Sequence, residues 1–179
     1  MTLRTGRLVL DQPTAADVDA ITEYCQDPLF EAYLTTPWPY ARENAVQFVE
    51  SYVPAGWADG SEYTWALRVD GVFLGVIGAR TGPGDVGFWL GAPFRRRGYM
   101  AEALGAVADW WFASLGRDAL RWECVVGNTA SAATARAAGF MFAGVAPAEM
   151  PSRDGSLPQS WHGIRRASDV HAPKHGWPV

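Results

Sequence analysis

The chain has 179 residues, 49% of them hydrophobic and 19% charged, and its formal net charge at pH 7 is −4. This length and apolar content predict a single domain around one core. The small negative charge argues against a general nucleic-acid binder, whose affinity would come from neutralised phosphates. The sequence has neither an apolar run long enough to span a bilayer nor a signal-peptide pattern, so we expect a cytoplasmic protein that does not bind membranes.

The cysteines and histidines do not suggest a metal centre. Cys25 falls in a predicted helix and Cys124 in a predicted strand, where we expect reduced, mostly buried thiols. His162, His171 and His175 all lie near the C-terminus without ligand-like partners. We therefore predict that the protein holds no metal.

The first third of the chain predicts one strand and two helices. Thr14 and Asp17 approximate a capping box at the start of the first helix. The second helix should be broken by Pro54-Ala55-Gly56. The expected elements are a strand at 8–10, a helix from Thr14 closed by Asp27-Pro28, a proline-rich aromatic loop at 35–40, and a helix at 42–52.

A three-strand meander follows. Residues 62–69 alternate large apolar and other side chains, the period of a half-buried strand. Asp70-Gly71 is a strong hairpin signal, so 72–80 should pair back antiparallel. The turn at 81–84 then predicts a third strand at 85–90.

A basic, glycine-bearing loop joins this third strand to a helix. The first N–H groups of a helix have no intrahelical partners and carry partial positive charge, so they suit a phosphate wherever glycine allows close approach. The three arginines at 95–97 add formal charge, and Gly98 is the approach point. The helix itself should end at Gly116, which sits where a C′ glycine belongs.

The last third of the chain alternates strands with one more helix. We expect strands at 120–126, 140–145 and 159–164, with Asn128 capping a helix over 129–138. Residues 1–166 should form the single domain and residues 167–179 a loose tail.

Two segments carry a family resemblance. The run Arg95-Arg96-Arg97-Gly98-Tyr99-Met100 resembles the acyl-CoA pyrophosphate loop of the GNAT superfamily of N-acetyltransferases, Gln/Arg-x-x-Gly-x-Gly/Ala, with Met100 in place of the last small residue. The flanking G-F-W-L at 87–90 and R-G-Y-M-A-E-A at 97–103 are similar to the RimJ/RimL-like branch. The segment 128–140 is similar to the family's Asn-x-x-Ser … Gly-Phe segment beside the pantetheine arm.

The resemblance covers about residues 7–164 and implies a fold and a cofactor. The fold is α/β and GNAT-like, a central, mostly antiparallel twisted sheet of about seven strands flanked by about four helices. The acyl donor is acetyl-CoA, as a cosubstrate. The residues that the resemblance places against it are Phe88, Trp89, Leu90, Arg95, Arg96, Arg97, Gly98, Tyr99, Met100, Ala101, Asn128 and Ser131.

Acyl transfer to an amine needs a base, an oxyanion site and an acid for the leaving thiolate. Asp85 stands where many GNAT enzymes carry a catalytic glutamate, with Glu123 on the neighbouring strand as the next candidate base and Glu149 as the third. The family position of the tyrosine acid is Ala135, whereas the RimL-like pattern supplies Ser131 as the acid. The backbone N–H of Leu90, beside Trp89, is the expected oxyanion donor.

The resemblance therefore predicts an N-acetyltransferase that acts by direct attack of an amine on acetyl-CoA in a ternary complex. The acceptor is a protein N-terminus or a small-molecule amine, including antibiotic or natural-product amines, and Trp38 and Tyr40 are expected to line its site. The alternative is a non-catalytic acyl-CoA sensor or partner-binding module that keeps the loop without the chemistry. A monomer and a homodimer are both compatible.

Overall fold

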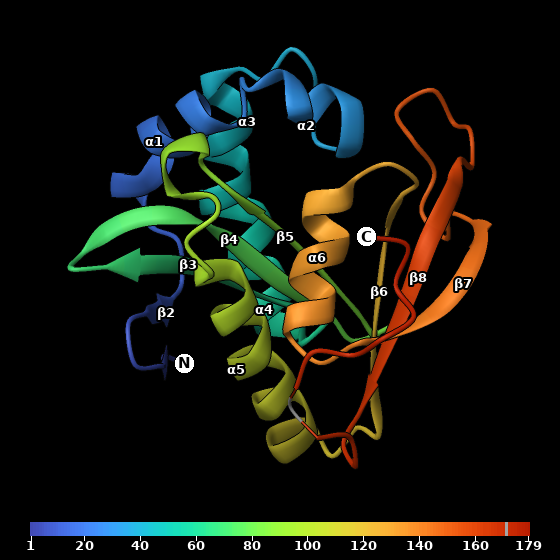
Figure 1. Ribbon diagram of the computed structural model, residues 1–179. Coiled ribbons are helices and arrows are strands. Elements are labelled where there is room, and N and C mark those ends of the chain that lie inside the picture. The colour runs from blue at the N-terminus through green and yellow to red at the C-terminus, as the bar shows by residue number, and fades with distance from the viewer. Residues whose placement is uncertain (171) are drawn as a thin grey trace.

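The computed structural model describes residues 1–170 and 172–179, so His171 lies outside the described part. Its strands form one mixed sheet in the order β1-β2-β3-β4-β5-β6-β8-β7 (Figure 1). All neighbouring pairs are antiparallel except β5 and β6, which are parallel. The strands are β1 Leu3–Arg4, β2 Val9–Asp11, β3 Glu62–Val69, β4 Val72–Arg80, β5 Asp85–Leu90, β6 Ala119–Val125, β7 Met141–Pro147 and β8 Gln159–Arg166.

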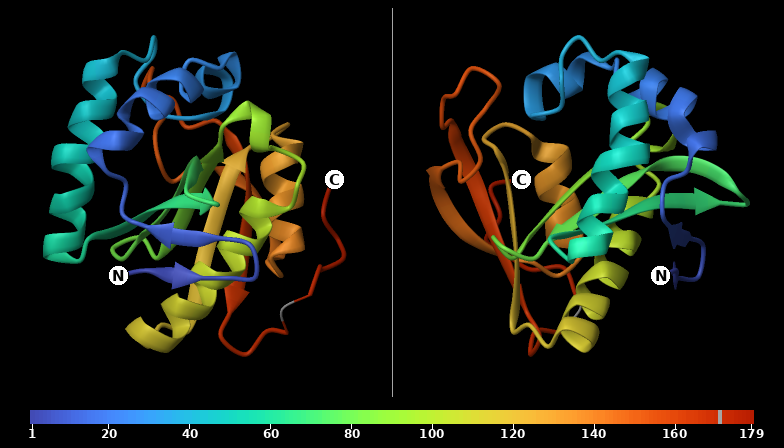
Figure 2. Two further views of the ribbon diagram at one scale, coloured as in Figure 1. Left: turned by 90° about the vertical axis from the view of Figure 1, so that its left-hand side faces the viewer. Right: turned by 180° about the vertical axis from the view of Figure 1, so that it is seen from behind.

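Helices cover both faces of this sheet, as the predicted α/β fold requires (Figure 2). One core lies between the sheet and α5 and α6, and the second lies on the other face, beneath α1 to α3. The two-residue strand β1 is the element that the sequence-based estimate of about seven strands lacks. The helices are α1 Val18–Tyr24, α2 Pro28–Tyr33, α3 Arg42–Gln47, α4 Val53–Asp59, α5 Tyr99–Leu115 and α6 Thr129–Ala137.

The predicted meander is confirmed in its bounds and in its antiparallel pairing. β3, β4 and β5 pair antiparallel in chain order. At the first turn, Asp70 and Gly71 have φ angles of 49° and 80°, the left-handed pair that a two-residue hairpin loop needs. The whole meander is therefore encoded by strand patterns and turn residues that are close together in the chain.

The prediction that Pro54 and Gly56 break the second helix is wrong. After α3 the chain widens into a π-helical segment, Phe48–Tyr52, and then continues as α4 to Asp59. The wide turn places Pro54 at the start of the new α-helical segment, where a missing N–H costs little. Gly56 lets the helix approach the sheet, since a Cβ there would lie 2.8 Å from the Glu62 carbonyl oxygen.

Helix α2 was not predicted. Asp27 and Pro28 indicated only the end of the preceding helix, yet they also begin the next one. The Asp27 carboxylate accepts a hydrogen bond from Leu29 N–H at 2.9 Å, and Pro28 occupies the first turn. Both are ordinary helix-start features, and their dual use hid this helix.

The C-terminal tail packs on the domain, contrary to the expected loose tail. The Trp177 indole N–H donates to Phe140 O at 3.1 Å, and its ring lies 5.4 Å from that of Trp122. Gly163 provides the space, because a Cβ there would lie 3.1 Å from the Trp177 ring. A partly buried tryptophan therefore ties the last residues to the sheet.

In the described residues no helix is both long enough and apolar enough to cross a membrane. Apart from residue 171, the chain also contains no group of three or more His, Cys, Asp or Glu side chains arranged to hold a metal ion.

Candidate active site

The parallel strands β5 and β6 separate soon after they begin. Asp85 pairs with Arg121 in the register, and Arg121 N–H donates to Gly84 O at 2.9 Å. Beyond this point the two strands diverge toward the upper end of the molecule, with α6 in front of the gap (Figure 1). The end of β5 therefore has backbone groups that β6 does not reach.

The chain leaves β5 through a short 3₁₀ turn, Ala92–Phe94, and enters α5 by the arginine loop. Arg96 and Gly98 have φ angles of 62° and 75°. Left-handed residues alternating with others turn successive N–H groups toward one side, which forms an anion-binding concavity next to the positive end of a helix. The loop therefore has the left-handed backbone and the helix start that such a concavity needs.

The three arginines of the loop do different things. Arg95 turns inward, where its Nε donates to Leu90 O at 3.0 Å and its Nη1 to Asp27 Oδ2 at 2.7 Å. Burial opposes ionisation of Asp27, but the Leu29 N–H and the Arg95 guanidinium together lower its pKa. Arg96 and Arg97 are exposed, so they carry the free positive charge of this loop.

The β1–β2 connection braces the start of α5. Glu102 accepts hydrogen bonds from Thr5 Oγ1 at 2.5 Å and from Arg7 Nε at 2.6 Å. Arg7 also donates to Arg97 O at 3.0 Å and lies over the Tyr99 ring at 4.7 Å. These contacts hold the predicted phosphate loop from outside.

The predicted cofactor residues divide between surface and core. Met100 is only 5% exposed and packs in the core with Ala103. Its side chain therefore does not reach the surface of the loop, and what remains there is the backbone from Arg95 to Gly98. Ala101, one residue later, is partly exposed in the first turn of α5.

The second predicted segment begins α6 as expected. Asn128 Oδ1 accepts a hydrogen bond from Ser131 N–H at 3.2 Å and so caps the helix. The Ser131 hydroxyl lies against the Cys124 thiol of β6. Burial raises the pKa of Cys124 to about 12, and the nearby Glu123 charge adds to this. Cys124 is therefore a thiol, not a thiolate, at neutral pH.

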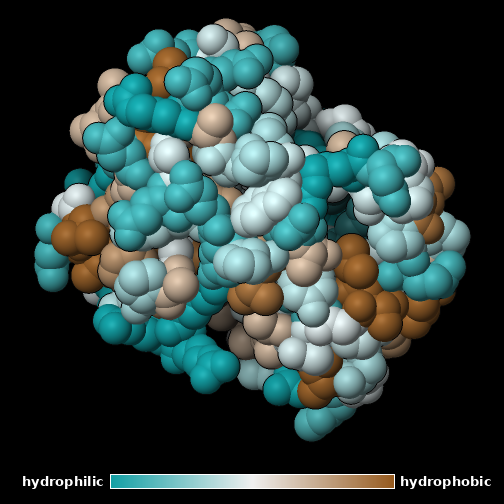
Figure 3. All heavy atoms as spheres, turned by 90° about the horizontal axis from the view of Figure 1, so that it is seen from above, coloured by the Kyte–Doolittle hydropathy of each residue, from teal (hydrophilic) through white to brown (hydrophobic). Residues whose placement is uncertain are grey.

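A cavity of about 820 Å³ opens beside the gap between β5 and β6. Its lining includes Phe88 and Cys124, which pack with the core under α5 and α6, and also Trp89, which packs with the core on the opposite face. Since neighbouring residues of a strand point to opposite faces, the cavity is lined from both faces of the sheet at this gap. Seen from above, the surface is hollowed between the helical part and the β7–β8 part (Figure 3).

Two carboxylates flank one guanidinium on three neighbouring strands at one side of this cavity. Glu62, Arg80 and Asp85 are register partners on β3, β4 and β5. Asp85 is 5% exposed, and both of its oxygens accept hydrogen bonds from Arg80, one of them at 2.9 Å from Nε. The first candidate base is thus in the cavity, but in a bidentate ion pair.

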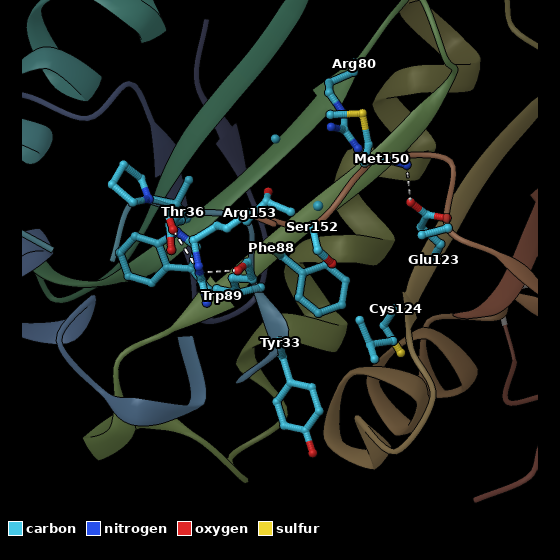
Figure 4. Close-up of a pocket in the computed structure, with 18 of the residues that line it drawn as sticks. Tyr33, Thr36, Arg80, Phe88, Trp89, Glu123, Cys124, Met150, Ser152 and Arg153 are labelled. Carbon is cyan, nitrogen blue, oxygen red and sulfur yellow. Dashed lines mark hydrogen bonds between the residues drawn. The ribbon is translucent and has the colours of Figure 1, made fainter. Parts of the chain in front are cut away.

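Glu123 faces the same cavity from β6. Its carboxylate accepts hydrogen bonds from Glu149 N–H at 2.9 Å and Met150 N–H at 3.3 Å, and it lies 3.8 Å from His162 Nδ1 (Figure 4). The Glu149 side chain points elsewhere and pairs with Arg121. Glu123 therefore both faces the cavity and holds the β7–β8 loop.

Arg153 closes the cavity from above. This residue of the β7–β8 loop reaches across to the end of α2, as Figure 4 shows beside Thr36. Its guanidinium donates to Leu34 O at 2.6 Å and Thr36 O at 3.0 Å, and also to Phe30 O and Glu31 O. This bridge, the Arg153 latch, joins two segments more than a hundred residues apart and roofs the groove.

Of the two residues expected to line the acceptor site, Tyr40 does line the cavity, while Trp38 packs against the second core. Most lining residues were not predicted from the sequence, and Tyr33, Glu62, Arg80 and Arg153 are the polar examples that matter for the site. For Glu62 and Arg80 the Asp70-Gly71 hairpin indicates only the neighbourhood, because a register shift between Leu67 and Arg68 moves the partner of Glu62 from Ala79 to Arg80. For Tyr33 and Arg153 no local pattern indicates the contact.

Residues 7–141 match the family model described as an acetyltransferase (GNAT) domain. The chain belongs to this family. The family resemblance inferred from the arginine loop is confirmed, and the protein is an N-acetyltransferase. A comparison with curated proteins finds no match.

Solved structures with the same fold include relatives of RimJ and RimL. An acetyltransferase that modifies the N-terminal serine of ribosomal protein L7/L12, from Salmonella typhimurium, aligns with a TM-score of 0.80 at 17% identity, over 94% of this chain and 100% of that one. RimJ of Mycobacterium smegmatis, solved with CoA-disulfide, gives 0.78 at 18%, over 93% and 86%. The microcin C7 self-immunity acetyltransferase MccE, solved with acetyl-CoA and AMP, gives 0.78 at 18%, over 90% and 93%.

Proposed function

We propose that this enzyme transfers an acetyl group from acetyl-CoA to a primary amine by direct attack in a ternary complex. The observation that carries the proposal is the cavity beside the gap between β5 and β6, which is lined by Phe88 and Cys124 on the face that α5 and α6 cover and by Trp89 on the opposite, roofed face. A donor and an acceptor approaching from the two faces would meet at the end of β5. The solved structures that contain CoA or acetyl-CoA support the choice of donor.

The donor side fits a coenzyme A diphosphate. Gly98 presents open space, since the nearest atom to a Cβ there is Arg7 Nη2 at 3.5 Å. The N–H groups at the start of the 17-residue helix α5 and the exposed Arg96 and Arg97 supply the positive charge. Bound there, acetyl-CoA supplies the activated acetyl group.

The Leu90 backbone is oriented to bind the acetyl oxygen. Leu90 pairs with Gly75, and Gly91 N–H donates to Leu74 O at 2.9 Å. In an antiparallel ladder this makes Leu90 a non-hydrogen-bonded position, so its own N–H points away from β4 and into the gap. A backbone N–H held rigidly at that place would stabilise a developing oxyanion.

Glu123 is better placed than Asp85 to accept the amine proton. Arg80 occupies both oxygens of Asp85, whereas Glu123 accepts from two backbone N–H groups and keeps further lone pairs for a water or an amine. We assign the base to Glu123, keep Asp85 as the partner that positions Arg80, and assign the acid to Ser131. The protonated Cys124 argues for direct attack and against an acyl-enzyme.

Release of free thiol tests the proposal. The protein with acetyl-CoA and a panel of primary amines, followed with a thiol reagent, should produce CoA in an amine-dependent manner, with acetylated amine found by mass spectrometry in equal amount. Glu123→Gln should reduce turnover and leave acetyl-CoA binding intact. Tight acetyl-CoA binding without amine-dependent thiol release would favour the non-catalytic sensor instead.

A further inference from the structure

The groove on the acceptor side is strongly acidic. Five carboxylates and two guanidiniums line it, a formal net charge of −3. Both guanidiniums are already engaged, Arg80 with the Asp85 carboxylate and Arg153 with four backbone carbonyls. Such a groove attracts a cation.

Glu62, like Glu31 and Asp154, is a lining carboxylate that forms no salt bridge in the described residues. Its Oε1 accepts a hydrogen bond from Thr64 Oγ1 at 3.2 Å, and its Oε2 accepts one from Tyr52 OH. Burial and the Glu62 contact raise the pKa of Tyr52 to about 12, so this partner stays neutral. The hydroxyl groups of Tyr52 and Thr64 are neutral donors, so they orient the Glu62 carboxylate without neutralising its negative charge.

A bare strip of backbone leads from Glu62 toward the end of β5. Gly78 and Gly87 are register partners on β4 and β5, and both line the groove. Glu62 Oε1 lies 2.5 Å from the position that a Cβ of Gly78 would take, so the carboxylate rests over this glycine. A Cβ on Gly87 would meet nothing within 4 Å. The paired glycines leave room for a slender chain.

The register sets the length of that chain. Gly87 lies three residues before Leu90, which is about 10 Å along a strand, and Gly78 lies one strand away, which adds about 5 Å sideways. The Glu62 carboxylate and the Leu90 N–H are therefore separated by about 11 Å by this geometry. An acceptor spanning this distance carries its two ends roughly 8 to 11 Å apart.

We propose that the acceptor is a small, linear dication, an aliphatic diamine or polyamine, whose distal ammonium is bound by Glu62 while its other nitrogen reacts. This inference depends on the proposed function, because it names the acceptor of the same site. The reacting nitrogen first gives its ammonium proton to solvent, so that its lone pair can form the new N–C bond as the thioester C–S bond breaks. It then loses a second proton to the base, and the leaving thiolate takes a proton to become the CoA thiol. The distal ammonium keeps its charge throughout.

A chain-length series tests this inference. CoA release is measured for α,ω-diamines of two to ten carbons and for monoamines of the same lengths, with wild type and Glu62→Gln. We expect kcat/KM to rise with diamine length to an optimum near six to eight carbons, at least about tenfold above the matched monoamine, because an ion pair in a partly buried groove adds at least that factor. Glu62→Gln should remove most of this preference and change monoamine rates less than about twofold, since a monoamine leaves the Glu62 position empty.

Glu50→Gln is the matched control, an exposed carboxylate in the same π-helical segment as Tyr52 that lines a separate surface depression. It should retain the diamine preference in full. Equal rates for diamines and monoamines in wild type would overturn the inference, whatever the folding of the variants. So would an equal loss on both substrate classes in Glu62→Gln. Amine-dependent release without a length preference leaves the proposed function standing, whereas no release with any amine overturns both.

Discussion

The donor side and the acceptor side of this enzyme are built in opposite ways. The donor side is made almost entirely by one continuous segment, strand β5, the arginine loop and the start of α5. The acceptor groove takes its lining from α2, α3, the π-helical segment, five strands and the β7–β8 loop. A diphosphate is bound by backbone groups that a short stretch of chain can present, whereas a groove for a variable acceptor needs walls from several elements.

The two sides also differ in charge. Arg96 and Arg97 are exposed at the donor loop, while the acceptor groove carries a formal net charge of −3. An anionic donor and a cationic acceptor would thus be attracted to different faces of one sheet. We therefore expect a substitution on either side to change the binding of one substrate and to leave the binding of the other unchanged.

The largest effect is expected at Gly98. Gly98→Trp should weaken acetyl-CoA binding at least about a hundredfold, because the indole would fill the concavity that accepts the phosphates. Calorimetry measures the affinity. Gly116→Trp is the control, since Gly116 caps the other end of α5 with a similar φ of 61° and open space around it. Both variants bear about 1 kcal/mol of left-handed strain, so equal binding by the two would refute the loop assignment.

The second prediction concerns Ser131, where the two sides meet. Ser131→Ala should lower kcat about a hundredfold, the lower end of what a positioned proton donor contributes, while the dissociation constant of acetyl-CoA changes little. Thr134→Ala removes another hydroxyl from α6, one that donates to Ala130 O at 2.9 Å. If the two variants have the same turnover, Ser131 is not the acid.

A smaller effect, on acceptor binding instead of acetyl-CoA binding, is expected at Gly87. Gly87→Val suits a strand and meets no atom, but it fills the floor of the groove, so the KM of the acceptor should rise about tenfold with acetyl-CoA binding unchanged. Gly82→Val, in the turn before β5 and also free of clashes, should leave both constants at the wild-type value. A loss of acetyl-CoA affinity in Gly87→Val would contradict the division of the site into two sides.

The smallest effect is expected at the Arg153 latch. Arg153→Ala frees the β7–β8 loop from α2, so the acceptor KM should rise about three- to fivefold because the roof must then be ordered on binding. Limited proteolysis should cut within 148–158 faster than in wild type. Arg42→Ala removes an exposed arginine paired with Asp19 and is the control. Unchanged KM together with unchanged cleavage would show that the latch does not order the roof.

Some predictions failed where two local signals competed. Asp27 and Pro28 indicated the end of one helix, and the structure uses them as the start of another. Pro54 indicated a helix break, but packing of α4 against β3, with Gly56 at the contact, favours continuing the helix through a π turn. In both places the local residues are compatible with two structures, and packing against distant parts of the chain selects one of them.

Local sequence signals were enough to predict the meander, the capped helices and the arginine loop before α5. These depend on turn glycines, cap residues and the φ angles of neighbouring residues, which act over a few positions of the chain. The acceptor groove, in contrast, depends on contacts between distant segments. Arg153 binds Leu34 across 119 positions of the chain, and the cavity lies where β5 and β6 diverge. Contacts of that range follow from packing of the whole chain, and no local pattern encodes them.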